Sequence, residues 1–298
     1  MTKKNKQNIH GIVLLDKPGG MTSNVALQKI KRLFNAKKAG HTGSLDPLAT
    51  GLLPICLGQA TKISEYLLHS DKKYTTIIKL GETTDTLDSE GEVLEKKEVD
   101  ISDDQIQDAI AQFRGEIKQV PPMYSALKKD GQPLYKLARK GEVIERPSRD
   151  MTVHSLDAIR LDQFHVQLKV HCSSGFYIRS LAHDLGQVLG CGAHVVELRR
   201  TAIKNVGLDQ TLTITELEKL TNLNDVILEI DSLIKDIPEL IINDQQAQSL
   251  LHGKLTMADK SQTTALSRLY TDNGKLFGIG RINEDNQLKT DKIFIMDD

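Results

Sequence analysis

The stretch KAGHTGSLDPLATGLLPICLGQATK, from Lys38 to Lys62, places one carboxylate, Asp46, between a glycine-rich turn and an apolar run. That run, Leu52-Leu53-Pro54-Ile55-Cys56-Leu57, is typical of a segment anchored in a protein core. An aspartate in a turn usually accepts hydrogen bonds from its own backbone. An exposed acid beside apolar walls can instead act as a nucleophile or a base, because desolvation strengthens its interactions. The residues alone leave both interpretations of Asp46 open.

The composition is that of an ordinary globular protein. The chain has 298 residues, of which 39% are hydrophobic and 27% charged, and this length predicts two domains. No segment approaches the roughly 18 consecutive apolar residues of a membrane span. No apolar signal core follows the basic N-terminus, so we expect a cytoplasmic protein with no membrane partner. Three cysteines without a CxxC pair, at positions 56, 172 and 191, predict reduced thiols.

The charges are unevenly distributed along the chain. Residues 1–45 contain nine basic residues (Lys or Arg) and one acidic residue. Residues 118–150 contain eight basic and four acidic residues, and residues 209–260 contain four basic and ten acidic residues. This asymmetry is compatible with a basic face that binds a polyanion, and equally with ordinary solvated surface.

Local patterns predict several helices and strands. Residues 11–24 read as a buried strand, a Pro-Gly-Gly turn and a helix cap at Thr22 or Ser23. The helix that follows is expected to bury Val25, Leu27, Ile30, Leu33 and Phe34. Further helices are predicted over residues 60–70, 101–112 and 177–190. Residues 72–99 read as a strand, a polar loop and a second strand, and residues 158–175 as a strand.

Two segments differ from this regular pattern. Residues 119–153 are basic, contain four prolines and show only one short helical segment, so they predict a functional or disordered excursion. After about Lys235 an Asn273-Gly274 turn between β-rich runs predicts a hairpin, and several short strands predict a small barrel. We therefore expect a catalytic domain over residues 1–235, with the basic insertion at about 119–153, and a second domain over residues 236–298.

No standard cofactor motif is present. The chain lacks a phosphate-binding GxxxxGK[ST] loop, a GxGxxG turn after a strand, HExxH and GxSxG. His41 and His69 have no convincing metal-ligating partners nearby in sequence. We therefore predict no metal site and no cofactor.

Five motifs, in order, resemble those of the TruB family, the tRNA pseudouridine-55 synthases. The segment from Gly40 to Leu53 matches the pattern G-H-x-G-x-L-D-P-x-A-x-G-x-L. The other four motifs are LLDKPGGMTSN, KKYTTIIKLGETTDTLDSEG, CSSGFYIRSLAHDLG and AHVVELRRT, and together the five span about Gly11 to Gly207. The C-terminal part resembles, more loosely, a small RNA-binding barrel of the PUA type.

The resemblance implies that the chain isomerises uridine 55 in the T-arm loop of tRNA to pseudouridine, without a cofactor, after turning the base out of the loop. The catalytic carboxylate would be Asp46. It would attack the uracil, attack the ribose or abstract a ribose proton, and the sequence does not choose among these routes. In each, a charged oxygen is held near a cationic or enolate-like centre.

Other site residues follow from the same resemblance. Tyr74 would stack on the target base and serve in proton removal from carbon 5. Arg179 would pair with Asp46 and keep it ionised, since a nearby cation lowers a carboxylate pKa by about 1–3 units. The remaining substrate-binding candidates are Tyr177 and Leu198 as walls of the uracil pocket, His41 in the space left by the base or in the RNA loop, and Lys17 as a support of the catalytic loop.

Basic residues of the insertion would contact RNA phosphates and form a flap that orders on RNA. These are Lys128, Lys129, Lys136, Arg139 and Lys140. A different class of function uses the same basic face: a non-catalytic tRNA-binding protein or RNA chaperone. A third candidate is the related synthase that works inside a guide-RNA complex. The compact length favours a stand-alone bacterial-type enzyme, a monomer that acts on tRNA without a protein partner.

The expected fold class is α+β. A mixed, mainly antiparallel sheet with flanking helices and a central RNA-binding cleft would be followed by a small C-terminal PUA-like β-barrel. Because Asp46, Tyr74 and Arg179 come from three distant segments, the enzyme hypothesis requires that the fold bring these segments together.

Overall fold

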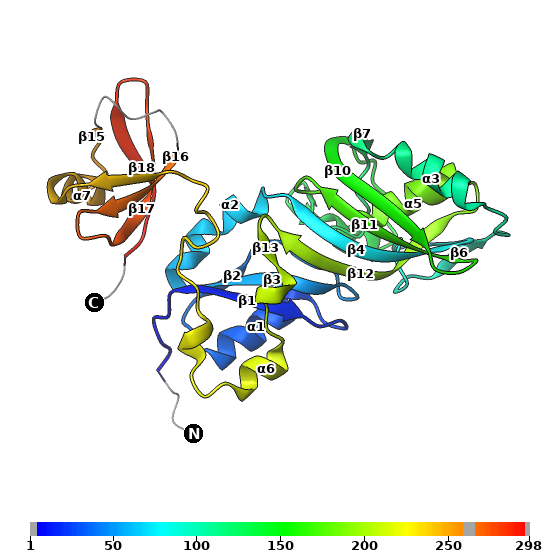
Figure 1. Ribbon diagram of the computed structural model, residues 1–298, viewed down its shortest axis with the longest axis horizontal. Coiled ribbons are helices and arrows are strands. Elements are labelled where there is room, and N and C mark those ends of the chain that lie inside the picture. The colour runs from blue at the N-terminus through cyan, green and yellow to red at the C-terminus, as the bar shows by residue number, and fades with distance from the viewer. Residues whose placement is uncertain (1–4, 259–265, 296–298) are drawn as a thin grey trace.

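The computed structural model describes residues 5–258 and 266–295. Within these ranges, a nine-stranded sheet is formed by residues up to Gly207, and a five-stranded sheet by residues from Glu239 onward. The smaller sheet stands apart at one end of the molecule (Figure 1).

The large sheet is mixed and mainly antiparallel, as predicted. Its main path runs β1-β3-β12-β4-β11-β10-β7, with β2 paired to β3 and β13 to β12. The strands are β1 (Gly11–Lys17), β2 (Ala39–His41), β3 (Thr50–Leu57), β4 (Lys72–Leu80), β7 (Gly115–Gln119), β10 (Arg149–Arg160), β11 (His165–Cys172), β12 (Ala193–Ile203) and β13 (Val206–Gly207). Only the contact between β12 and β3 is parallel among these pairs of the described chain.

Helices flank this sheet. They are α1 (Ser23–Leu33), α2 (Ser64–Leu68), α3 (Asp103–Ala111), α4 (Leu134–Ala138), α5 (Ile178–Val188) and α6 (Ile214–Lys219), with 3₁₀ turns over Gly58–Ile63, Leu208–Gln210 and Leu223–Val226. Thr22 caps α1 by accepting a hydrogen bond from the Val25 amide, and Ser102 and Gln105 form a capping box on α3. These caps satisfy amides that the first helical turn leaves free.

Two local predictions were wrong in detail. Val25 is 45% exposed, and Ala26 takes the core position beside Leu27 and Ile30. Residues 158–175 do not form one strand, because the Asp162 carboxylate accepts hydrogen bonds from the amides of Phe164 and His165. That side-chain turn separates β10 from β11 and makes the two strands a hairpin.

Strand β3 is buried on both faces. Alternate residues enter two different clusters: Leu53 and Ile55 pack with α1 and α6, whereas Leu52 and Cys56 pack on the opposite side with the 3₁₀ turn before α2 and with residues 230–237. A strand covered on both faces reads as a continuous apolar run, which explains the Leu52–Leu57 stretch.

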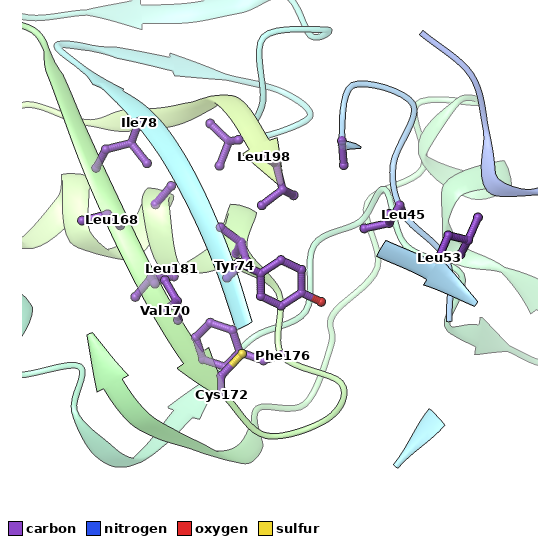
Figure 2. Close-up of a cluster of buried hydrophobic side chains, with 14 of the residues drawn as sticks. Leu45, Leu53, Tyr74, Ile78, Leu168, Val170, Cys172, Phe176, Leu181 and Leu198 are labelled. Atoms are coloured by element: carbon purple, nitrogen blue, oxygen red, sulfur yellow. The ribbon is translucent and has the colours of Figure 1, made fainter. Parts of the chain in front are cut away.

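At the other end of the sheet, strands β4, β11 and β10 are buried on one face only. Their inner face packs against α3 and α5, and Figure 2 shows Ile78, Leu168 and Val170 in this cluster. Their other face, which we call the open face, carries the alternate residues of β4 and β11, such as Lys73 and Lys169.

Two further sheets have two strands each. Strands β5 (Glu82–Thr84) and β6 (Val93–Lys96) pair with each other, as do β8 (Lys128–Lys129) and β9 (Gln132–Pro133). The second pair and α4 are the regular structure of the basic insertion, whose helical segment near residue 134 was predicted.

The C-terminal residues form a curled, PUA-like sheet, in agreement with the prediction. Its strand order is β14-β16-β17-β18-β15. The elements are β14 (Glu239–Ile242), α7 (Asp244–Leu251), β15 (Thr256–Met257), β16 (Leu266–Thr271), β17 (Leu276–Ile282) and β18 (Gln287–Ile293). The turn at Asn273-Gly274 joins β16 to β17 as the predicted hairpin.

The two sheets meet at a seam. Ile279 and Phe294 share a buried cluster with Ile12 and Leu52 of the large sheet. Lys62 donates a hydrogen bond to the Ile293 carbonyl at 2.6 Å, and Lys292 pairs with Glu65 at 3.0 Å. In the described parts of the chain, no helix is both long and apolar enough to cross a membrane.

Candidate active site

Asp46 lies in the loop between β2 and β3, and the start of α1 fixes this loop. The Ser23 hydroxyl accepts a hydrogen bond from the Leu45 amide at 2.7 Å and donates one to the Leu45 carbonyl at 3.0 Å. The Gly20 amide donates to the Pro47 carbonyl at 2.9 Å. The residues on either side of Asp46 are therefore tied to the same helix start, which restricts where the carboxylate points.

Lys17 holds the same loop through hydrogen bonds to backbone carbonyl oxygens. Its side chain is fully buried, and its ammonium donates hydrogen bonds to the carbonyl oxygens of Met21 at 2.7 Å, Pro18 at 2.9 Å and Pro47 at 3.4 Å. Burial lowers the pKa of Lys17 to about 8, while the charge of Asp46 acts in the opposite direction. These hydrogen bonds tie Lys17 to Pro47 of the Asp46 loop, and its supporting role in catalysis stays a prediction.

The fold brings Arg179, at the start of α5, to Asp46. The Arg179 Nε lies 2.9 Å from Asp46 Oδ2; the arginine side chain is 5% exposed and that of the aspartate 37%. The pair therefore joins a buried cation to a carboxylate that solvent, and hence a substrate, can reach.

Three further groups hold the guanidinium. Nη1 donates to the Thr86 carbonyl at 2.9 Å and lies 3.4 Å from Asp88 Oδ2, and Nη2 donates to the Tyr124 carbonyl at 2.7 Å. Asp88 is itself buried and accepts hydrogen bonds from the Thr86 hydroxyl and the Glu90 amide. A planar guanidinium bound on all sides has little freedom to rotate, so Arg179 presents Nε to Asp46 in one orientation.

The electrostatic balance at Asp46 differs from the prediction. Burial raises the pKa of the Asp46 carboxyl, and this outweighs the lowering by Arg179; the negative charge of Asp88 raises the pKa further. The expected ion pair is present, but the expected net lowering of the carboxyl pKa was wrong. Sequence reasoning counted the cation and did not include desolvation or the second acid.

Tyr74 lies on the inner face of β4 and is 9% exposed. Figure 2 shows its ring near Leu198, with the hydroxyl directed toward the side where Leu45 lies. Burial raises the pKa of the Tyr74 phenol, and the charge of Arg200 opposes that rise. Arg200 is fully buried on β12 and donates to the carbonyls of Leu52 at 2.8 Å and Gly43 at 3.2 Å.

The remaining predicted residues lie around this centre. Tyr177 immediately precedes α5 and is close enough for the charges of Asp46 and Arg179 to affect its pKa, which burial raises. His41 is partly buried at the end of β2, where burial lowers its pKa, and its Nδ1 has no hydrogen-bond partner within the described residues.

The five basic residues of the insertion are all exposed, and within the described ranges none forms an ion pair with an acid. Arg139 lies over the Tyr135 ring at 5.7 Å. Their exposed side chains can therefore meet phosphates.

Asp88 and Arg200 were not assigned roles from the sequence. Both occupy positions within the quoted motifs, Asp88 at the end of TDTLD and Arg200 in LRRT. Their roles depend on contacts 91 and 148 residues away, to Arg179 and Leu52, which no local pattern could reveal.

Family models match almost the whole chain. Residues 31–178 match "TruB family pseudouridylate synthase (N terminal domain)", residues 179–236 match "tRNA pseudouridylate synthase B C-terminal domain", and residues 238–293 match "Pseudouridine synthase II TruB, C-terminal". Curated relatives named tRNA pseudouridine synthase B include one from Stutzerimonas stutzeri, 50% identical over 96% of both chains, and one from Pseudomonas putida strain GB-1, 48% identical over the same shares.

Solved structures share the fold. A Cbf5-Nop10-Gar1 complex contains a chain that is 26% identical with a TM-score of 0.73, covering 96% of this chain and 85% of the other. An H/ACA RNP bound to a substrate RNA containing 2'-deoxyuridine contains one that is 24% identical with a TM-score of 0.72, covering 96% and 86%. The second likeness supports the fold alone.

Proposed function

The chain belongs to the TruB family of pseudouridylate synthases, and on this premise we propose that it isomerises uridine 55 in the T-arm loop of tRNA, with Asp46 as its catalytic carboxylate. The observation that carries the assignment of Asp46 is its pairing with Arg179: a partly exposed acid held by a buried cation. Such a pair fixes one carboxylate oxygen while the group stays within reach of a substrate.

The reaction sets the tasks of the site. The bond between uracil N1 and ribose C1′ breaks, the uracil turns, and a bond forms between C5 and C1′. C5 then loses a proton and N1 ends with one, so the product is an isomer and nothing is consumed. The protein must extrude the base, hold the freed uracil, stabilise charge at the reacting centre and move one proton.

Asp46 is suited to the charge-stabilising or nucleophilic task. In all three routes that remain open, an ionised oxygen faces the ribose or the uracil, and Arg179 would hold that oxygen in place throughout. The contacts of Arg179 with Thr86, Asp88 and Tyr124 support this role, because a fixed guanidinium costs no reorganisation during the reaction.

Tyr74, Tyr177 and Leu198 would receive the everted uracil. Extruding a loop nucleotide costs a few kcal/mol, which stacking on an aromatic ring and phosphate contacts offset. The raised pKa of Tyr74 keeps its phenol protonated, which favours stacking over service as a preformed base. We assign His41 to the space left by the base, since its buried Nδ1 has no hydrogen-bond partner in the described structure.

The basic insertion would contact phosphates of the T arm through Lys128, Lys129, Lys136, Arg139 and Lys140. We also propose a catalytic domain over residues 1–235 and a PUA-like domain over residues 236–298. The enzyme would act in the cytoplasm as a monomer without a protein partner. An idle tRNA-binding protein would have no need for the Asp46–Arg179 pair, so we favour catalysis.

The test is to map pseudouridine in tRNA treated with the purified chain and with Asp46→Asn, and to measure tRNA binding by both. We expect the variant to bind tRNA and form no product. Asp157→Asn is the matched control, because Asp157 also faces an arginine, Arg114 at 4.0 Å, but is 71% exposed and remote from the site. Product formation by Asp46→Asn would remove Asp46 from its role.

A further inference from the structure

A cluster of two histidines and one carboxylate lies on the open face of the large sheet. It consists of Asp71, His154 and His171. His171 on β11 pairs with Lys73 on β4, whereas the neighbouring pair, Val170 and Tyr74, faces the core. Because successive residues of a strand alternate between faces, the cluster and Tyr74 lie on opposite faces of the sheet. The proposed function uses none of these three residues.

A β-bulge puts the two histidines together. Val153 is opposite Cys172 and Ser155 is opposite His171, which leaves His154 as the extra residue of β10. Bulges redirect a side chain that regular pleating would point elsewhere. The His154 and His171 rings lie 4.6 Å apart between centroids, with an interplanar angle of 46°.

Asp71 completes the cluster from a third segment. It immediately precedes β4, and its carbonyl accepts a hydrogen bond from the Lys204 amide at 3.1 Å, which fixes the backbone there. Its Oδ2 lies 3.0 Å from His154 Nε2. One ligand atom from each of the three residues lies within 4.8 Å of the others.

We propose that Asp71, His154 and His171 form a binding site for a divalent transition metal ion of the Zn²⁺ class. Two imidazole nitrogens and one carboxylate oxygen are a typical donor set for such ions. Metal–ligand distances of about 2.0–2.2 Å place tetrahedral ligand atoms about 3.4 Å apart. Small side-chain rotations bring the three atoms to that spacing, and water completes the shell at this exposed position.

The electrostatic surroundings favour the metal-binding form of His171. Burial lowers its pKa, and the charges of His154 and Lys73 lower it further while Asp71 opposes them. A neutral imidazole is the form that binds a metal. Lys73 repels the ion itself, and the carboxylate of Asp71 offsets that charge. A bound metal ion would cross-link the start of β4 to the β10–β11 hairpin. This structural role is separate from the proposed role of Asp46.

Direct titration of the untagged, chelator-stripped full chain tests the site, with Co²⁺ as the spectroscopic probe and Zn²⁺ as the competitor. We expect one Co²⁺ per chain with visible d–d bands, and loss of the bands when Zn²⁺ is added. His154→Ala and His171→Ala should each weaken Zn²⁺ binding at least about tenfold, since even outer-shell changes commonly cost 10–100-fold.

His165→Ala is the matched control. His165 also points from the open face of β11 and lies 2.9 Å from a carboxylate, Asp162, but it has no second histidine beside it in the described structure. This variant should bind Zn²⁺ like the wild type. Equal loss in His165→Ala, or wild-type affinity in the His154→Ala/His171→Ala double variant, would overturn the proposal.

A second readout does not depend on spectra. Zn²⁺ should raise the thermal unfolding midpoint of the wild type and of His165→Ala, with reversal by chelator, and leave the double variant unchanged. Circular dichroism without metal verifies that all variants fold. A midpoint that rises equally in the double variant would place the metal elsewhere and contradict the assignment.

Discussion

At the scale of single residues, Arg179 organises the candidate site. It is a buried cation between two carboxylates, one partly exposed at Asp46 and one buried at Asp88. The two acids have different surroundings, so they have different tasks: Asp88 is held by its own loop and secures the arginine, and Asp46 faces outward. Replacing either acid therefore changes the electrostatic environment of the other acid, because both contact the same guanidinium.

The pH dependence of the reaction follows from this arrangement. The negative charge of Asp88 raises the pKa of Asp46, and the proposed mechanism requires Asp46 in its ionised form. Removing the charge by Asp88→Asn lowers the pKa of Asp46, so the acid limb of the rate profile moves to lower pH. Single-turnover pseudouridine formation between acidic and neutral pH measures this limb.

Asp85→Asn is the control for that measurement. Asp85 lies in the same loop but accepts hydrogen bonds from Tyr124 and Glu92 rather than contacting Arg179. Asp85→Asn should keep the acid limb of the rate profile at the same pH as in the wild type. The maximal rate of Asp88→Asn will also fall, since Arg179 loses a partner, but a limb shifted to higher pH would contradict the charge argument.

At the scale of elements, β3 connects the core to the loop that carries Asp46. It starts directly after that loop, is buried on both faces and runs parallel to β12 at Arg199 and Arg200. The close approach depends on Gly51, which has a φ of +102° and where a Cβ would lie 2.3 Å from the Arg200 carbonyl oxygen. The crossing in turn brings Arg200 beside Tyr74 and the loop at Gly43.

Gly51→Ala should therefore destabilise the fold. Backbone strain at a left-handed position costs about 1–3 kcal/mol, and the overlap with Arg200 adds to it. Gly20→Ala is the control, because Gly20 also has a positive φ, +75°, but has no neighbour within 4 Å of the added carbon. Urea unfolding should show a larger loss of unfolding free energy for Gly51→Ala; equal losses would contradict the close-approach argument.

The basic insertion carries its own prediction. Lys128 and Lys129 form β8 and are exposed. If each neutralises a phosphate, Lys128→Ala and Lys129→Ala should each reduce the salt slope of tRNA binding by about 1. Dissociation constants measured over a series of KCl concentrations give this slope. Lys169→Ala, on the open face, should leave the salt slope unchanged. An equal reduction by Lys169→Ala would indicate that the slope depends on overall charge and not on contacts of the basic insertion.

At the scale of the whole molecule, the two sheets are one packed body at the seam. Phe294 follows the last strand and is buried in the same cluster as Ile12 and Leu52 of the large sheet. The hydrogen bond from Lys62 and the ion pair of Lys292 lie beside it. Leu45 and Ala49 of the Asp46 loop belong to the other buried cluster, so we expect the seam to contribute to stability rather than to chemistry.

Phe294→Ala should lower the free energy of unfolding by about 3–5 kcal/mol, the usual cost of deleting a buried phenyl group. Hydrogen exchange of the amides in β16–β18 should accelerate, because their contact with the large sheet is weakened. Phe164→Ala is the control: at 42% exposed, it should change stability by no more than about 0.5 kcal/mol. An equal effect of both variants would mean that the seam is not a stabilising contact.

Local signals predicted most elements because their causes are local. The Ser102 cap, the Asn273-Gly274 hairpin and the helix near residue 134 each depend on residues within a few positions. The hairpin at Asp162 was missed because its turn depends on one side chain that interrupts an otherwise regular alternation. Motifs likewise indicated Asp46, Tyr74 and Arg179 as site candidates before any geometry was known.

The sequence by itself determined the family, the reaction class and the candidate carboxylate, since ordered sequence motifs identify all three. Only the tertiary structure decided the net direction of the Asp46 pKa, the place of Asp88 beside Arg179, and the meeting of His154 with His171 and Asp71. The physical reason is that desolvation and charge interactions depend on distance in space. Sheet register sets those distances, and it joins residues that are far apart along the chain.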